Sequence, residues 1–166
     1  MSEADLIQIL ARGEDSHHQF KRDATNADGL AAELVALANS GGGKVLLGVA
    51  DDGSVLGLDA AAVRRLNQLV SNTASQHVRP PLSPLSHNVQ TAQGLVMVVT
   101  VPDGLNKPYM DLQGRVWVKS GADKRHVTAR EEMQRMFQRA GLLQADQVPV
   151  RNATAADIDE RAFGRY

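Results

Sequence analysis

Hydrophobic residues along the first 141 positions follow two spacings, one typical of helices and one typical of strands. Apolar side chains three or four positions apart, as at Leu30, Leu34 and Leu37, mark one face of a helix. For the last helix, Thr128 and Glu131 have the spacing of a capping box, in which each side chain bonds the other's backbone N–H. The pattern predicts four helices, over residues 2–11, 26–37, 60–77 and 128–140.

Between these helices, short runs that alternate or are rich in β-branched residues predict strands. "HHQFKR" and "KVLLGVA" are two of them, and an Asp-Asp-Gly turn at 51–53 predicts a return strand in "SVLGL". Residues 85–101 form a predicted hairpin around Ala92-Gln93-Gly94, and 108–110 with 115–119 form a shorter one around "DLQG". This mixture predicts an α+β fold, a two-layer mixed sheet with hairpins packed against about three main helices. The domain is expected to span 1–141, and 142–166 to be a linker or the start of a following region.

The glycine run Gly41-Gly42-Gly43, followed by Lys44, resembles a phosphate-binding loop at first sight. A Walker-type loop follows a strand, contains glycines and then a lysine with a hydroxyl residue directly after it, and leads into a helix. Here a helix comes first, a strand follows, and Val45 stands where the hydroxyl would be, which argues against a triphosphate site of that type. Two interpretations stay open: a helix end with a tight entry into a strand, and a place where backbone approaches a ligand closely.

Composition narrows the classes of protein. The chain is 43% hydrophobic and 22% charged, as globular domains are, and it has no cysteine, which excludes disulfides and thiolate metal sites. No apolar run approaches the roughly 20 residues that cross a bilayer, and the N-terminus lacks a signal-peptide pattern, so a cytoplasmic protein is expected. The net charge of −1 does not by itself indicate nucleic acid, so the distribution of cations matters.

Three blocks of the sequence stand out together: "GEDSHHQFK", "LVALANSGGGKVLLGVADDGSVLGL" and "RVWVKSGADKRHVTAREEM". In this order they resemble the Schlafen AlbA-type (AlbA_2) domain of bacterial regulator-like and helicase-related proteins, often described as DNA-binding. The family's Glu-Phe-Lys block is matched by Gln19-Phe20-Lys21, its Ala-Asn block by Ala38-Asn39, and its aromatic-x-Arg block by Trp117-Val118-Lys119. The resemblance implies nucleic-acid binding, DNA or RNA, and the N-terminal module of a transcriptional regulator.

An alternative implied by the resemblance is a metal-dependent RNase, because animal Schlafen relatives cleave RNA with three carboxylates. Glu14 and Asp52, or Asp51, could supply two of them and hold a divalent cation. Gln19 replaces the third acid with a neutral amide, which weakens this alternative. Binding without catalysis, and without a metal or other cofactor, is therefore the favoured interpretation. A third possibility is a dimerisation or scaffolding module, and a homodimer is left open.

Cations distributed along the chain are the candidate contacts to phosphate. In a strand, Arg115, Trp117 and Lys119 would point to one face, placing two cations beside an aromatic ring on which a base could stack. The predicted nucleic-acid-binding residues are Lys21, Arg22, Asn39, Arg115, Trp117, Lys119, Lys124 and Arg125. His17 and His18 are neighbours on a predicted strand and point to opposite faces, so they do not form a metal pair. No catalytic or metal-ligating residue is assigned.

Overall fold

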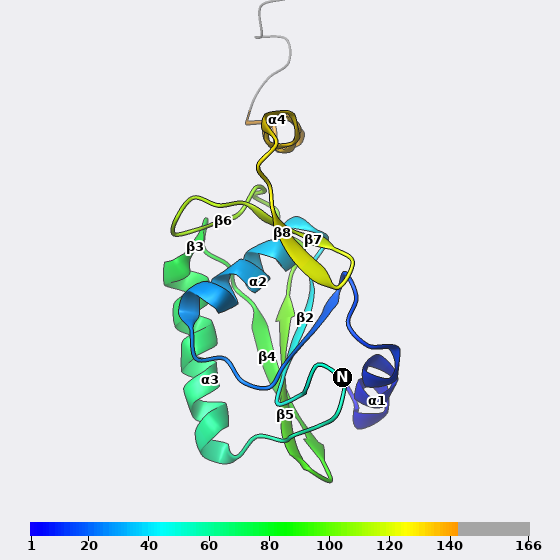
Figure 1. Ribbon diagram of the computed structural model, residues 1–166. Coiled ribbons are helices and arrows are strands. Elements are labelled where there is room, and N and C mark those ends of the chain that lie inside the picture. The colour runs from blue at the N-terminus through cyan, green and yellow to red at the C-terminus, as the bar shows by residue number, and fades with distance from the viewer. Residues whose placement is uncertain (143–166) are drawn as a thin grey trace, which may run out of the picture.

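The computed structural model describes residues 1–142, which form a mixture of helices and strands (Figure 1). The helices are α1 (Glu3–Arg12), α2 (Ala27–Asn39), α3 (Ala60–Asn72) with a π-helical turn, η1 (Thr73–His77), and α4 (Arg130–Arg139). The strands are β1 (His18–Lys21), β2 (Gly43–Leu47), β3 (Val78–Arg79), β4 (Leu85–Thr91), β5 (Gly94–Val101), β6 (Met110–Asp111), β7 (Trp117–Ser120) and β8 (Asp123–His126). None of these helices combines the length and the apolar character that crossing a membrane requires.

The main sheet has four strands in the order β1-β2-β5-β4. β1 and β2 run parallel because α2 connects them, whereas β2 with β5 and β5 with β4 are antiparallel. Two small sheets, β3 with β6 and β7 with β8, pack against α2. The sheet is therefore mixed, and the predicted α+β class is confirmed.

Alternation along the strands divides the core between the two faces of the sheet. Met97, Val99 and Val101 of β5 belong to a core cluster with α2 and α3, while Val96 and Val98 pack in a second cluster with Leu6 of α1. α1 thus covers part of the face opposite α2, adding a helix on the second side of the sheet. Both clusters consist of fully or almost fully buried side chains, which fixes the register of the sheet.

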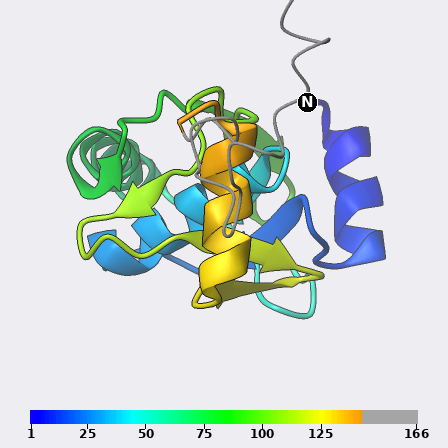
Figure 2. The ribbon, with the colours of Figure 1, turned by 90° about the horizontal axis from the view of Figure 1, so that it is seen from above.

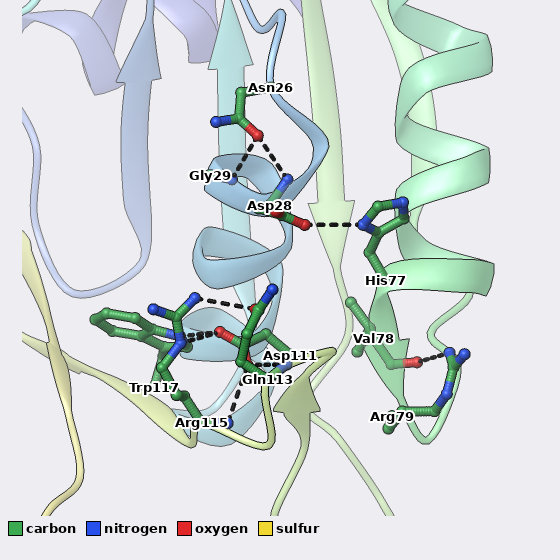
Figure 3. Close-up of polar contacts among 10 residues, drawn as sticks. All are labelled: Asn26, Asp28, Gly29, His77, Val78, Arg79, Asp111, Gln113, Arg115 and Trp117. Carbon is green, nitrogen blue, oxygen red and sulfur yellow. Dashed lines mark hydrogen bonds and ion pairs between the residues drawn. The ribbon is translucent and has the colours of Figure 1, made fainter.

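The first two helices begin within one residue of their predicted starts, and a side chain caps each of them. Ser2 forms a capping box with Asp5, its Oγ accepting from Asp5 N at 3.2 Å and its N donating to the Asp5 carboxylate at 2.8 Å. The Asn26 side chain caps α2 by accepting from Asp28 N at 2.9 Å and Gly29 N at 3.4 Å (Figure 3). The helix then continues through a buried run from Leu30 to Ala38, so α2 is the central helix of the domain.

Two predicted hairpins differ from the structure. The return strand in "SVLGL" does not form: Val49 and Val55 make one isolated bridge, and Leu58 then bridges to Leu95 of β5. The arms 108–110 and 115–119 do not pair either, because β6 pairs with β3, and β7 turns at Gly121 to pair with β8. Each of these segments pairs with a strand other than its predicted neighbour: Leu58 with β5, β6 with the earlier strand β3, and β7 with the later strand β8. These partners become apparent only in the folded chain.

The predicted capping box of the last helix is also wrong. α4 begins at Arg130 with Ala129 as its N-cap, and no side chain caps it. Val127 N donates to Val116 O at 2.8 Å, which prolongs the pairing of the β7–β8 hairpin and keeps the chain extended past Thr128. α4 buries no residue and lies across the end of the domain near this hairpin (Figure 2). The predicted region 142–166 falls, from residue 143 on, outside the described residues.

The glycine run ends α2 and begins β2. Gly41 and Gly42 have φ of +100° and +81°, and Gly42 N donates to Leu37 O at 2.8 Å. A Cβ on Gly43 would lie 2.5 Å from His17 O, so the close approach that this glycine permits is to the chain's own backbone. The interpretation as a helix end with a tight strand entry is confirmed.

Candidate nucleic-acid interface

The β7–β8 hairpin is held against the C-terminal end of α2 by the side chain of Asn39. Its Nδ2 donates to Tyr109 O at 3.0 Å and to Trp117 O at 2.9 Å, and its Oδ1 accepts from Tyr109 N at 2.8 Å. Ser40 Oγ accepts from Lys119 N at 2.8 Å. Asn39, predicted as a nucleic-acid contact, is thus engaged in holding the hairpin in place.

Three lysines from three strands surround one buried carboxylate, that of Glu33 on α2. Lys21 of β1 and Lys124 of β8 both approach Glu33 Oε1, at 3.1 and 2.6 Å, while the Glu33 side chain is only 3% exposed. Lys119 of β7 lies close enough for the Glu33 charge to act on its pKa. We call Lys21, Lys119 and Lys124 the lysine cluster. Residues about 100 positions apart thus meet beside the middle of α2.

The charges within the lysine cluster influence one another. Burial favours the neutral form of Glu33, but the hydrogen bond from Lys124 and the charges of Lys21 and Lys124 outweigh it and lower the pKa of the carboxyl. Burial lowers the pKa of Lys119, and the charges of Glu33 and Glu14 oppose this change. Glu33 Oε2 is buried with no hydrogen-bond partner among the described residues, so two lysines share its other oxygen. Glu33 therefore compensates part of the lysine charge.

Glu14 and Gln19 extend the cluster on the side of β1. Lys119 Nζ donates to Gln19 Oε1 at 2.8 Å and to Ala122 O. Gln19 Nε2 in turn donates to Glu14 Oε1, which also accepts from Phe20 N at 2.6 Å. Asp52 lies in its own turn, where its carboxylate accepts from the hydroxyl of Ser54 at 2.6 Å. Within residues 1–142, no group of three or more metal-ligating side chains comes together.

Arg115 and Trp117 lie together, as predicted, but the ring is not an open platform. The Arg115 guanidinium stacks 5.2 Å from the Trp117 ring centroid, and both side chains donate to Asp111 Oδ2, at 2.7 and 2.9 Å (Figure 3). Asp111 is buried, and burial by itself would raise the pKa of its carboxyl. The hydrogen bonds from Trp117 and Arg115 and the charge of Arg115 outweigh this effect and lower that pKa. Trp117 is half-buried against the core. These residues stabilise the hairpin base and leave little indole surface for a base to stack on.

Arg22 and Arg125 are the two remaining predicted cations. Arg22 is exposed just beyond β1, where its charge acts on Asp52, and it forms no ion pair within residues 1–142. Arg125 of β8 forms a two-pronged ion pair with Glu132 of α4, at 2.5 and 3.0 Å. That pair connects the hairpin to α4.

A groove lies between α4 and the hairpin and consists of two adjoining chambers that share Asn39, Met136 and Arg139. We call it the α4 groove. Its cationic chamber, of about 360 Å³, is further lined by Val118, Lys119, Arg125, Glu132 and Arg135. Its apolar chamber, of about 340 Å³, is further lined by Gly104, Leu105, Lys107 and Ala140. Lys107 and Arg139 were not predicted as site residues; the spacing of Arg135 and Arg139, one helical turn apart, was the available signal.

Known proteins resemble this domain in sequence and in fold. The family model "Schlafen, AlbA_2" matches residues 14–128. The chain belongs to the Schlafen AlbA_2 family. The match spans the glycine run, the lysine cluster and the β7–β8 hairpin, but it leaves α1 and α4 outside. No curated protein matches the chain.

Solved structures resemble this AlbA_2 domain in fold. The DIP2311 protein of Corynebacterium diphtheriae has a TM-score of 0.55 at 22% identity, over 97% of this chain and 36% of that one. The N-terminal domain of a RecG-related ATP-dependent DNA helicase protein of Nitrosomonas europaea has a TM-score of 0.51 at 23% identity, over 78% of this chain and 96% of that domain. The chain thus spans about a third of the length of the first protein. Identities this low bear on the fold alone.

Proposed function

We propose that this AlbA_2 domain binds nucleic acid through the face formed by β1, the β7–β8 hairpin and α4. The single observation that carries the proposal is a surplus of positive charge along this face. Within the described residues, the carboxylates that lie near the cations of this face are fewer than the cations themselves; they are Glu14, Glu33, Asp52, Asp123 and Glu132. The cations are Lys21, Arg22, Lys119, Lys124, Arg125, Arg135 and Arg139.

The predicted residues divide into two roles under this proposal. Lys21, Arg22, Lys119, Lys124 and Arg125 contact phosphates, since ammonium and guanidinium groups neutralise the backbone without reading sequence. The remaining predicted residues, Asn39, Arg115 and Trp117, hold the hairpin that presents them.

The proposal extends to the context of the domain. Because DIP2311 is about three times as long as the matching region, and the Nitrosomonas europaea structure is an N-terminal domain, we propose that this domain is the N-terminal module of a larger regulator. A cytoplasmic location is part of the same proposal. Two of the carboxylates named for an RNase accept hydrogen bonds within the chain, Glu14 from Gln19 and Phe20, and Asp52 from Ser54, so binding is favoured over cleavage.

The test is a titration of fluorescently labelled DNA and RNA across salt concentrations. Five phosphate contacts predict a slope of log affinity against log salt of about −4, and a loss on the order of 10²-fold or more between 50 and 200 mM salt. Lys119→Ala with Arg125→Ala should weaken binding to all sequences alike and reduce the slope by about 2. The matched control is Arg12→Ala with Arg64→Ala, two exposed arginines on α1 and α3. Equal effects of the two double variants would refute the proposed face.

A further inference from the structure

We propose that the α4 groove binds a single strand of nucleic acid, with a backbone phosphate in the cationic chamber and an unpaired base in the apolar chamber. The inference rests on the proposed function and adds which form of nucleic acid the domain prefers. It depends on α4, which lies outside the family match at residues 14–128.

The cationic chamber has the charge that a phosphate requires. Arg135 and Arg139 lie one turn apart on α4 and face the same side, opposite Lys119 on β7. Glu132 is the one carboxylate among the described residues that line the chamber, and Arg125 already engages both of its oxygens. Within residues 1–142, Arg135 and Arg139 form no ion pair, so their guanidinium groups are available to the oxygens of a phosphate.

The apolar chamber has the character that the flat face of a base requires. Leu105 at its edge is 95% exposed, and Met136 supplies a polarisable sulfur, which makes favourable contacts with aromatic rings. No carboxylate is among the described residues that line this chamber, and the charge of Lys107 is matched by Asp103 at 2.5 Å. An inserted base would remove Leu105 from water, which accounts for an exposed leucine at this position.

The two chambers adjoin, as a site for one nucleotide of a single strand requires. The chambers adjoin at Met136 and Arg139, so a phosphate and its own base can occupy them together. Asn39 lines both chambers, and its side-chain amide is hydrogen-bonded to Tyr109 and Trp117. These bonds keep the amide in place when a ligand binds. A base in a duplex is stacked on both faces and paired at its edge, so only an unpaired base can enter.

The experiment compares three labelled probes of equal length: a dT 12-mer, a 12-mer of abasic residues, and a 12-base-pair duplex. The protein should bind the dT strand at least fivefold more tightly than either of the others at 100 mM salt, because base contacts in single-strand sites contribute about 1–3 kcal/mol each. Leu105→Ser with Met136→Ser should abolish the preference for dT over the abasic strand. Arg135→Ala with Arg139→Ala should weaken binding to both strands, by roughly tenfold.

Matched controls separate these effects from unspecific ones. Leu85→Ser removes another exposed leucine, 74% accessible on β4, and should leave all three affinities unchanged. Because α4 buries no residue and Leu105 is exposed, the variants should fold, and circular dichroism checks this. Equal binding of duplex and dT strand, or a preference for dT that persists in the Leu105→Ser, Met136→Ser protein, would overturn the inference while leaving nucleic-acid binding intact. No binding to any probe would refute the proposed function and this inference with it.

Discussion

Replacing Glu33 with glutamine should lower the stability of the domain and at the same time tighten its binding to nucleic acid. Glu33→Gln keeps the shape of the side chain but removes the charge that Lys21 and Lys124 share. If the lysine cluster contacts phosphate, Glu33 competes with the ligand for the same two ammonium groups. The two effects therefore have opposite signs, which few other mechanisms predict.

The magnitude of the stability change follows from the burial of the three groups. Removing one partner of a fully buried ion pair costs about 3–5 kcal/mol. Glu33 is 3% exposed, but Lys21 and Lys124 retain 28% and 29% exposure, so water compensates part of the loss. We expect a decrease in the free energy of unfolding of about 2–3 kcal/mol, which corresponds to roughly 5–10 °C in Tm for a domain of this size.

The expected gain in affinity follows from Coulomb's law. Lys21 and Lys124 lie 3.1 and 2.6 Å from Glu33 Oε1, so a phosphate bonded to the other side of either ammonium group would lie roughly 6 Å from that oxygen. Removing the negative charge at that distance, at a dielectric constant between those of protein and water, is worth about 1 kcal/mol, or roughly fivefold in Kd. The assay is the anisotropy titration at 100 mM salt, combined with urea unfolding. The fluorescence of Trp117, the single tryptophan, reports whether the hairpin stays packed.

Glu3→Gln serves as the control, because Glu3 is an exposed carboxylate on α1 and its loss changes the net charge equally. A Glu33→Gln protein that keeps its native Trp117 emission but binds no more tightly than the Glu3→Gln protein would refute the competition between Glu33 and phosphate. An unchanged free energy of unfolding would refute the inferred role of Glu33 in stability.

Three further outcomes follow from the same contacts. The pKa of Glu33 is lowered on folding, so its contribution is complete above its ordinary value of 4.5 and is lost as pH falls through the lowered value; the stability difference between wild type and Glu33→Gln should shrink on acidification from about pH 5 to 3, measured by urea unfolding. Asn39→Ala removes three hydrogen bonds to Tyr109 and Trp117 and should cost about 2–4 kcal/mol in urea unfolding, whereas a loss below about 1 kcal/mol would contradict its role in holding the hairpin. Gly43→Ala places a Cβ 2.5 Å from His17 O and should lower Tm well beyond Gly114→Ala, whose Cβ meets open space and which costs only about 1–2 kcal/mol for its φ of +73°; equal shifts in Tm would show that the strand entry tolerates a side chain.

Local patterns in the sequence were sufficient for the helices and the main hairpin. The starts of α1 and α2 lie within one residue of the predicted ones, because a helix start depends on residues close together in the chain: the side chains of Ser2 and Asn26 cap N–H groups at most three residues away. The hairpin of β4 and β5 was predictable because its strands are adjacent in sequence and one is rich in β-branched residues. The glycine run was correctly interpreted as the end of a helix, since it directly follows the apolar repeat of α2.

Strand pairing across longer separations was not predictable. The "SVLGL" segment and the arms around "DLQG" have strand-like composition, but their partners are decided by competition among all available edges. β6 pairs with β3, more than 30 residues earlier, and neither two-residue strand has a sequence pattern that indicates the other as its partner. Thr128 likewise has the composition of a cap, yet the continued pairing of Val127 with Val116 keeps it out of the helix.

The sequence alone determined the fold class, the family and the set of cations, because these depend on periodicity, motif and composition. Only the tertiary structure decided which cations are compensated: in the sequence Glu33 is one residue of the predicted helix 26–37, and folding placed it between Lys21 and Lys124. The α4 groove is likewise a product of folding, since its walls come from residues near 39, 105, 119 and 135. Charge and shape at a surface depend on distances in space, and residues far apart in the chain contribute to both.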